Sequence, residues 1–209
     1  MKLAVVVSAT LLVSLSTAVA QKLSVKQGKI YLESAGGTRQ LTSSGRDSDP
    51  ALSPHGRFVV FVRGTPDKTI STGSGEEEAT ELCMIGVDGK NPLVLLRGKE
   101  SSEPRALLAG MSSPQFSPDG KKIYFASAAW ATSGAIHVYD LATKEEKFFC
   151  EGNAPKVLGS GEYKGHLIVL KHKYFLGGGS YDWYWLVKPD GTEVGPIGED
   201  AKDFLELQK

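Results

Sequence analysis

Residues 114–125 read PQFSPDGKKIYF, and residues 50–61, 64 positions earlier, read PALSPHGRFVVF. Each copy predicts a strand, a tight turn with glycine where positive φ is needed, and a second strand rich in β-branched and aromatic residues. Pro54 and Pro118 preset φ for the turn while ending the strand before it. The repeat therefore predicts a chain built from antiparallel hairpins.

Each copy is followed by two further apolar stretches, which complete a unit of four strands. These stretches are 82–87 and 92–96 after the first copy, and 135–141 and 147–150 after the second. The flanks at 28–42 and 183–192 read as strand, turn and strand, like the second half of the unit. Between them, 154–170 keeps a worn first half. The second half of a unit thus comes first in the chain, ahead of the first complete unit.

No stretch shows a sustained helical period with caps, so the fold class is all-β. Four-stranded units in series bury their apolar faces by stacking radially around an axis, which predicts a small β-propeller of about four four-stranded blades. We expect a single domain over 21–209. Its blades are predicted at about 21–45 with a closing C-terminal strand at 203–208, then at 46–100, 101–153 and 154–198.

Two motifs resemble the β-propeller repeats of the TolB family, a WD40-like repeat family. They are the Ser-Pro-Asp-Gly turn before a Lys-Lys-Ile-Tyr-Phe strand at 117–125, and the strand, Gly-Gly turn and strand at 30–42. The resemblance is good over 28–152 and weak over 154–198. It implies a propeller scaffold and a role in envelope complexes. The motif identifies the repeat and not the activity, since such blades serve many functions.

The six blades and separate N-terminal domain of the TolB family do not fit this chain. Two arrangements are open: four blades that close into a ring, or an open propeller arc that hides its edges by pairing with another chain. We favour the ring, because propellers are built from a regular number of repeats. The apolar alternation at 204–207 also suits a strand that completes the first blade.

Residues 1–20 predict a cleaved signal peptide. Lys2 is their only charge, an apolar run covers 3–15, and Ala18-Val19-Ala20 is a cleavage signal. Cleavage leaves 189 of the 209 residues, with no segment of membrane-spanning length. The expected location is periplasmic or secreted, without stable membrane insertion.

The charge balance argues against a nucleic-acid partner. The chain has 24 basic and 24 acidic residues, so it lacks the cationic excess that a nucleic-acid partner demands.

Cys83 and Cys150 lie in strand-like stretches, and in an oxidising compartment they either form a disulfide or remain buried thiols. We favour unpaired thiols, because sequence cannot establish the close approach that a bridge requires.

Long connections at 63–80, 98–111, 126–134 and 173–181 are predicted to emerge on one face of the propeller, opposite the short turns. Loops grouped on a rigid face are typical of a binding site for a protein partner. Exposed aromatic and arginine side chains most often anchor such interfaces. The alternative for the aromatic residues is that they fold back as lids over the core. The candidate partner-binding residues are Arg63, Arg105, Trp130, Tyr174, Phe175 and Tyr181.

The four histidines show no metal-binding or nucleophile motif, so the sequence predicts no catalytic residue, no metal and no cofactor. We therefore expect a non-enzymatic protein-binding module, in envelope complexes or as an inhibitor or immunity-type protein. The alternative is a degenerate carbohydrate-active lyase or hydrolase on a propeller scaffold. An enzyme needs convergent titratable groups, which the motifs do not supply.

Overall fold

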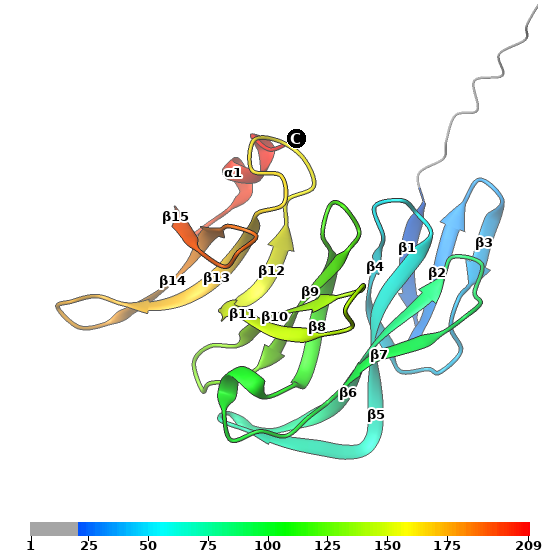
Figure 1. Ribbon diagram of the computed structural model, residues 1–209, viewed down its shortest axis with the longest axis horizontal. Helices are drawn as coiled ribbons and strands as arrows, with labels where there is room; N and C mark the ends of the chain where they lie inside the picture. Colours follow the sequence, from blue (N-terminus) through cyan, green and yellow to red (C-terminus); the bar gives the residue numbers. More distant parts are fainter. Residues whose placement is uncertain (1–20) are drawn as a thin grey trace, which may run out of the picture.

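Antiparallel β-strands make up most of the protein in a computed structural model, which describes residues 21–209 except for the side chain of Asp67. The signal peptide predicted at 1–20 lies outside the described residues. The strands form four sheets that follow one another along an open arc (Figure 1). We call these sheets blades 1 to 4. They confirm the all-β propeller predicted from the repeat.

Within each blade, strands that are neighbours in the sequence are neighbours in the sheet. Blade 1 has three strands: β1 (Lys22–Lys26), β2 (Lys29–Ser34) and β3 (Gly37–Gln40). Blade 2 comprises β4 (Asp47–Leu52), β5 (Phe58–Thr72), β6 (Gly75–Gly86) and β7 (Leu93–Arg97). Blade 3 comprises β8 (Ala109–Phe116), β9 (Lys122–Ala128), β10 (Ala135–Asp140) and β11 (Glu146–Glu151). Blade 4 comprises β12 (Asn153–Val157), β13 (Leu167–Tyr174), β14 (Ser180–Val187) and β15 (Glu193–Gly198). A short 3-10 helix, η1 (Pro104–Ala106), precedes blade 3, and α1 (Lys202–Glu206) follows blade 4.

The apolar cores lie between successive blades, because alternate residues of a strand face opposite sides of its sheet. In β5, Val59 and Phe61 pack with blade 1, whereas Val60 packs with blade 3. In β9, Phe125 belongs to the core shared with blade 2, and Tyr124 to the core shared with blade 4. The middle blades thus bury both of their faces.

The inner strands β4, β8 and β12 each contain the same bulge. Asp49, Ser113 and Ala154 have left-handed φ values of 49°, 51° and 46°, and each precedes a proline. The pairing register with the second strand of the blade shifts at each of these points. Non-glycine residues rarely adopt this conformation, so the repeated bulge is a built feature of the inner strands.

Side chains from the inner strands tie neighbouring blades together. The Asp49 carboxylate accepts a hydrogen bond from the Ser113 backbone at 3.0 Å. The Gln115 side chain donates to the Pro155 carbonyl and accepts from the Val157 backbone at 3.0 Å. These bonds fix the angle between successive blades at the centre of the arc.

The blades do not close into a ring, so the closed arrangement that we favoured from the sequence is wrong and the open arc is confirmed. Blade 1 and blade 4 lie at opposite ends of the arc (Figure 1). Each terminal sheet has its outer face finished in a different way. The outer face of blade 1 is largely polar, with Lys22, Ser24 and Lys26 opposite Glu33, Tyr31 and Lys29. The outer face of blade 4 is covered by α1.

The strand predicted at 203–208 is also wrong, because α1 occupies this segment. Phe204 and Leu205 are adjacent in sequence and both pack on the core of blade 4, together with Ile168. A strand would place them on opposite faces, whereas a helix presents both to one sheet. The Phe204 ring stacks on Tyr163 with 5.7 Å between the centroids. The segment therefore covers blade 4 instead of completing blade 1.

The two cysteines are free and buried, as we favoured from the sequence. Cys83 lies in the core between blades 1 and 2, and Cys150 in the core between blades 3 and 4. Burial raises the pKa of each thiol to about 11. Both side chains therefore act as small apolar core residues.

The packing of α1 predicts that Phe204→Ala lowers the free energy of unfolding by about 2 kcal/mol, since it removes a half-buried aromatic ring. Urea denaturation followed by circular dichroism measures the change. Leu207→Ala is the control, because Leu207 is 81% exposed, and it should shift stability by less than about 0.5 kcal/mol. Equal stability of the two variants would show that α1 does not contribute to the blade 4 core.

Candidate binding surface

The long connections and the short turns lie on different sides of the arc. Figure 1 shows the β5–β6, β9–β10 and β13–β14 connections along the lower and left side, and the β4–β5 and β8–β9 turns at the top. Gly73, at the tip of the β5–β6 hairpin, lies against the backbone of Ala129 and Ala131 in the β9–β10 connection. The connections of blades 2 and 3 thus form one continuous surface.

The most prominent element on this side is an arm formed by residues 171–183. β12 pairs with β13 only as far as Leu170, and β15 pairs with β14 only from Tyr184 onward. Between these points β13 and β14 pair only with each other and project beyond the sheet (Figure 1). A turn containing Gly178 and Gly179, with φ of +94° and +82°, closes the arm. These left-handed values favour glycine at both positions.

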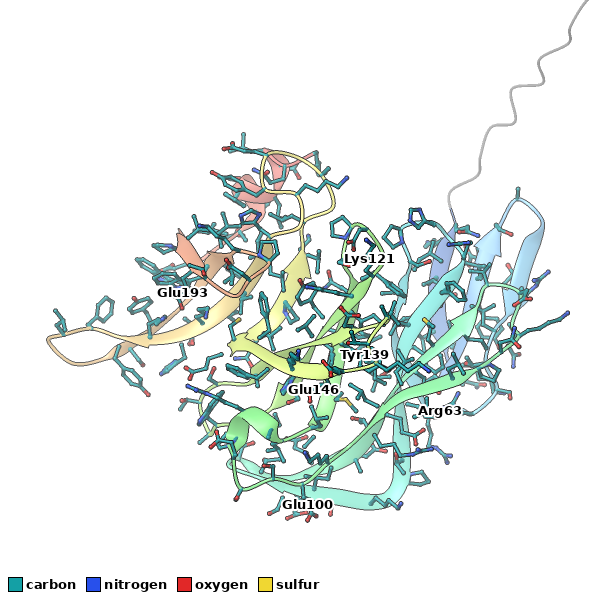
Figure 2. The ribbon with its side chains drawn as sticks, in the orientation of Figure 1. Arg63, Glu100, Lys121, Tyr139, Glu146 and Glu193 are labelled. Carbon is teal, nitrogen blue, oxygen red and sulfur yellow. The ribbon has the colours of Figure 1, made fainter. Side chains whose placement is uncertain are left out.

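The base of the arm is held by ion pairs. The ammonium groups of Lys171 and Lys173 lie 3.0 and 3.1 Å from the Glu193 carboxylate, which comes from β15 (Figure 2). Burial alone would raise the pKa of Glu193, but the hydrogen bonds and charges of the two lysines hold it below its ordinary value. Lys173 also lies over the Trp185 ring, 4.9 Å from its centroid. These contacts fix the direction in which the arm projects.

The tip of the arm exposes apolar side chains. Tyr174 is 69% exposed, Phe175 is 53% exposed, and Leu176 is fully exposed. The Phe175 ring packs on Tyr181 at 4.6 Å, and Tyr181 packs on Trp183 at 4.8 Å. An apolar tip on a braced hairpin has the composition of an interface anchor.

A second aromatic cluster faces the base of the arm. The Arg105 guanidinium lies 5.3 Å from the Phe148 ring, and Trp130 packs edge-on against the same ring at 6.3 Å. Arg105 also approaches the Glu151 carboxylate at 3.6 Å. A hollow of about 290 Å³ lies between this cluster and the base of the arm, with Phe148 and Glu151 on one wall and the arm lysines on the other.

Of the six predicted partner-binding residues, Tyr174, Phe175 and Tyr181 lie on the arm. Arg105 and Trp130 contact Phe148, on the wall of the hollow opposite the arm lysines. The residues that hold them in place were not predicted from the sequence; these are Phe148, Lys171, Lys173, Trp183 and Glu193. Pairing 174 with 180 across the glycine turn would have placed the lysines opposite the aromatic residues.

Arg63 lies apart from the other five, on blade 2 (Figure 2). Its guanidinium makes two hydrogen bonds with the fully buried Asp47 carboxylate, at 2.7 and 3.3 Å. Burial alone would raise the pKa of Asp47, but hydrogen bonds from Arg63, Thr42 and Ser44 outweigh burial and lower it. Arg63 thus holds β4 against β5, away from the arm.

Blade 3 also contains three side chains linked by hydrogen bonds, which were not predicted from the sequence. His137 Nδ1 lies 2.6 Å from the Glu146 carboxylate, and Nε2 lies 3.2 Å from Ser127 Oγ. The order serine, histidine and carboxylate is that of a nucleophilic triad. Here Ser127 is only 4% exposed, and its hydroxyl donates to the Leu107 carbonyl at 3.0 Å. These hydrogen bonds thus tie the 98–108 loop to blade 3.

Two further observations concern metals and membranes. Among residues 21–209, no cluster of three histidine, cysteine or acidic side chains is placed to hold a metal ion. The helices in this part of the chain are too short to cross a bilayer.

Comparison with known proteins establishes the fold alone. No family model and no curated protein matches the sequence. Among solved structures, TolB from Acinetobacter baumannii aligns over 85% of this chain and 40% of its own, with a TM-score of 0.55 and 16% identity. Porphyromonas gingivalis dipeptidyl peptidase 4 aligns over 86% and 31%, with a TM-score of 0.56 and 12% identity.

The β-propeller domain of the Trilobed protease from Pyrococcus furiosus, described as having an open velcro topology, aligns over 83% of this chain and 49% of its own. Its TM-score is 0.53 and the identity is 13%. This chain spans less than half the length of each of the three. The likeness establishes a TolB-like β-propeller fold, which different functions share.

The Asp47–Arg63 contact predicts that Asp47→Asn lowers the free energy of unfolding by about 2 kcal/mol at pH 7, because charge-assisted hydrogen bonds are lost. The pKa of Asp47 is lower in the folded state than its ordinary value of 3.8. The stabilisation is therefore complete above pH 3.8, and it disappears as the pH falls through the lowered pKa.

Urea denaturation from pH 7 to pH 2 measures this loss. Glu145→Gln, which breaks an exposed ion pair with Lys147, is the control and should change stability by less than about 0.5 kcal/mol. A deficit in Asp47→Asn that persisted undiminished at pH 2 would contradict the electrostatic origin of the effect.

Proposed function

We propose that this protein is a non-enzymatic, periplasmic or secreted module that binds a protein partner through the arm and the cluster facing it. The observation that carries the proposal is the exposed tip formed by Tyr174, Phe175 and Leu176. Solvent-exposed apolar side chains grouped at a projecting tip are uncommon in a soluble protein unless another molecule covers them.

The arm suits protein recognition for two physical reasons. Its base is braced by Glu193 and Trp185, so little conformational entropy is lost when the tip becomes ordered in a complex. Its apolar tip is followed by charged and polar groups at the base, which matches the apolar centre and polar rim of interfaces. Arg105 and Trp130 extend the contact surface across the hollow.

The proposed location rests on the signal peptide predicted at 1–20. The resemblance to the TolB repeats suggests a partner within an envelope complex. An inhibitor or immunity-type role is a second form of the same proposal, in which the arm enters the active site of an enzyme or toxin. The carbohydrate-active alternative requires convergent titratable groups that a substrate can reach. Ser127, His137 and Glu146 do not support this alternative, because Ser127 is buried and its hydroxyl is bonded to the Leu107 carbonyl.

Photo-crosslinking in the producing cells tests this proposal. A benzoyl-phenylalanine placed at Phe175 should form a covalent adduct with one protein. Phe58 is the matched control, because it is a 41% exposed phenylalanine on blade 2, and the same probe there should form no adduct with that protein.

The captured partner then allows an affinity measurement. Phe175→Ala should raise Kd roughly 30-fold, the equivalent of about 2 kcal/mol for an aromatic anchor, whereas Phe58→Ala should leave it unchanged. Equal crosslinking from both positions, or none from Phe175, would refute the arm as a binding element. Degradation of an oligosaccharide by the purified protein would refute its non-enzymatic character.

A further inference from the structure

Within residues 21–209, blade 1 has no counterpart of the inner strand that the other three blades possess. Blades 2, 3 and 4 each have four strands, with β4, β8 and β12 nearest the centre of the arc. Blade 1 has only β1, β2 and β3 among the described residues.

Sequence and packing both assign the empty position to the inner strand. Residues 30–42 match the third and fourth strands of the repeat, so β2 and β3 hold those places and β1 holds the second. The packing agrees, because β4 lies against β1 and β2 as β8 lies against the second and third strands of blade 2, β5 and β6. In blade 2, β8 also covers the inner strand β4, whereas no strand of the described part of blade 1 occupies the place that β4 has in blade 2.

The free edge of β1 retains the features of an unfinished pairing. Apart from the ladder with β2, the backbone of Lys22–Lys26 makes no hydrogen bond within residues 21–209. Val25 points to the apolar side shared with Ile30 yet is 41% exposed. Unpaired strand edges are templates for the addition of another strand.

The charges near this edge indicate what strand it can accept. Lys22, Lys26 and Lys29 share the outer face of blade 1 with one acidic residue, Glu33. A second copy of this chain paired antiparallel through β1 would place Lys22 opposite Lys26, and such like-charge pairs are destabilising. A strand with acidic residues at those two positions would be attracted instead.

We propose that the free edge of β1 binds an extended segment of a partner protein in which acidic side chains alternate with apolar ones. The segment runs antiparallel to β1, since β4, β8 and β12 all run antiparallel to the second strands of their blades. Its apolar residues cover Val25, and its acidic residues face Lys22 and Lys26. This site is separate from the arm, and the proposal for the β1 edge does not depend on the function proposed for the arm.

Two peptides test the proposal on the purified protein. Acetyl-GEVTVEG-amide places glutamates opposite Lys22 and Lys26, and acetyl-GKVTVKG-amide places lysines there. Titration followed by amide NMR should give shifts centred on residues 22–26 and a Kd at least tenfold lower for the acidic peptide. Hydrogen exchange of the β1 amides should slow when that peptide is bound.

Variants then distinguish peptide binding at the β1 edge from nonspecific binding elsewhere on the protein. Val25→Lys should weaken binding of the acidic peptide at least tenfold, whereas Val94→Lys should not, although Val94 is a 39% exposed valine on the outer edge strand β7. The double variant Lys22→Glu with Lys26→Glu should prefer the basic peptide. Phe175→Ala should bind the acidic peptide like the wild type, so failure of the arm proposal would be distinguishable.

Three results would overturn the inference. Equal affinity for the two peptides would remove the charge argument, and shifts centred on β7 or another outer strand would remove the edge argument. Protection of the β1 amides that rises with protein concentration, in the absence of peptide, would assign the edge to a second copy of this chain.

Discussion

Each sheet of this protein must bury its apolar faces, and the rest of the structure follows from how that requirement is met. Among the described residues, four apolar clusters lie between successive blades, two of them between blades 2 and 3, and a fifth lies between blade 4 and α1. Every core is shared by neighbours in the sequence, so the fold is a linear series of contacts and not a ring. Stability in such a series is approximately a sum over units and their interfaces.

The blades could be predicted from sequence because hairpins are local. The Ser-Pro-x-Gly turns and the apolar strands around them fix pairing within about 50 residues. Closure depends instead on what the two terminal sheets present, which no repeat count reveals. At 204–207 the apolar residues fit a strand as well as one helical turn, and only the apolar outer face of blade 4, which Ile168 and Tyr184 help to form, makes the helix the better choice.

The candidate surface was predictable to the extent that it consists of aromatic residues in long connections. Tyr174, Phe175 and Tyr181 stand beside a run of glycines, which marks a loop. The supporting contacts were not predictable, because Glu193 reaches Lys171 only through the pairing of β14 with β15. The pairing of Arg63 was not predictable either, because its buried partner Asp47 lies on the inner strand of the same blade, 16 residues earlier.

The left-handed bulges at Asp49, Ser113 and Ala154 also bear on how this protein can change over evolutionary time. A β-branched side chain at these positions would clash with its own backbone, and the following proline narrows the choice further. Substitution at these three positions of the inner strands is therefore restricted to small or short polar residues and glycine. The outer strands of each blade are free of that restriction. Their sequences can therefore diverge further than those of the inner strands.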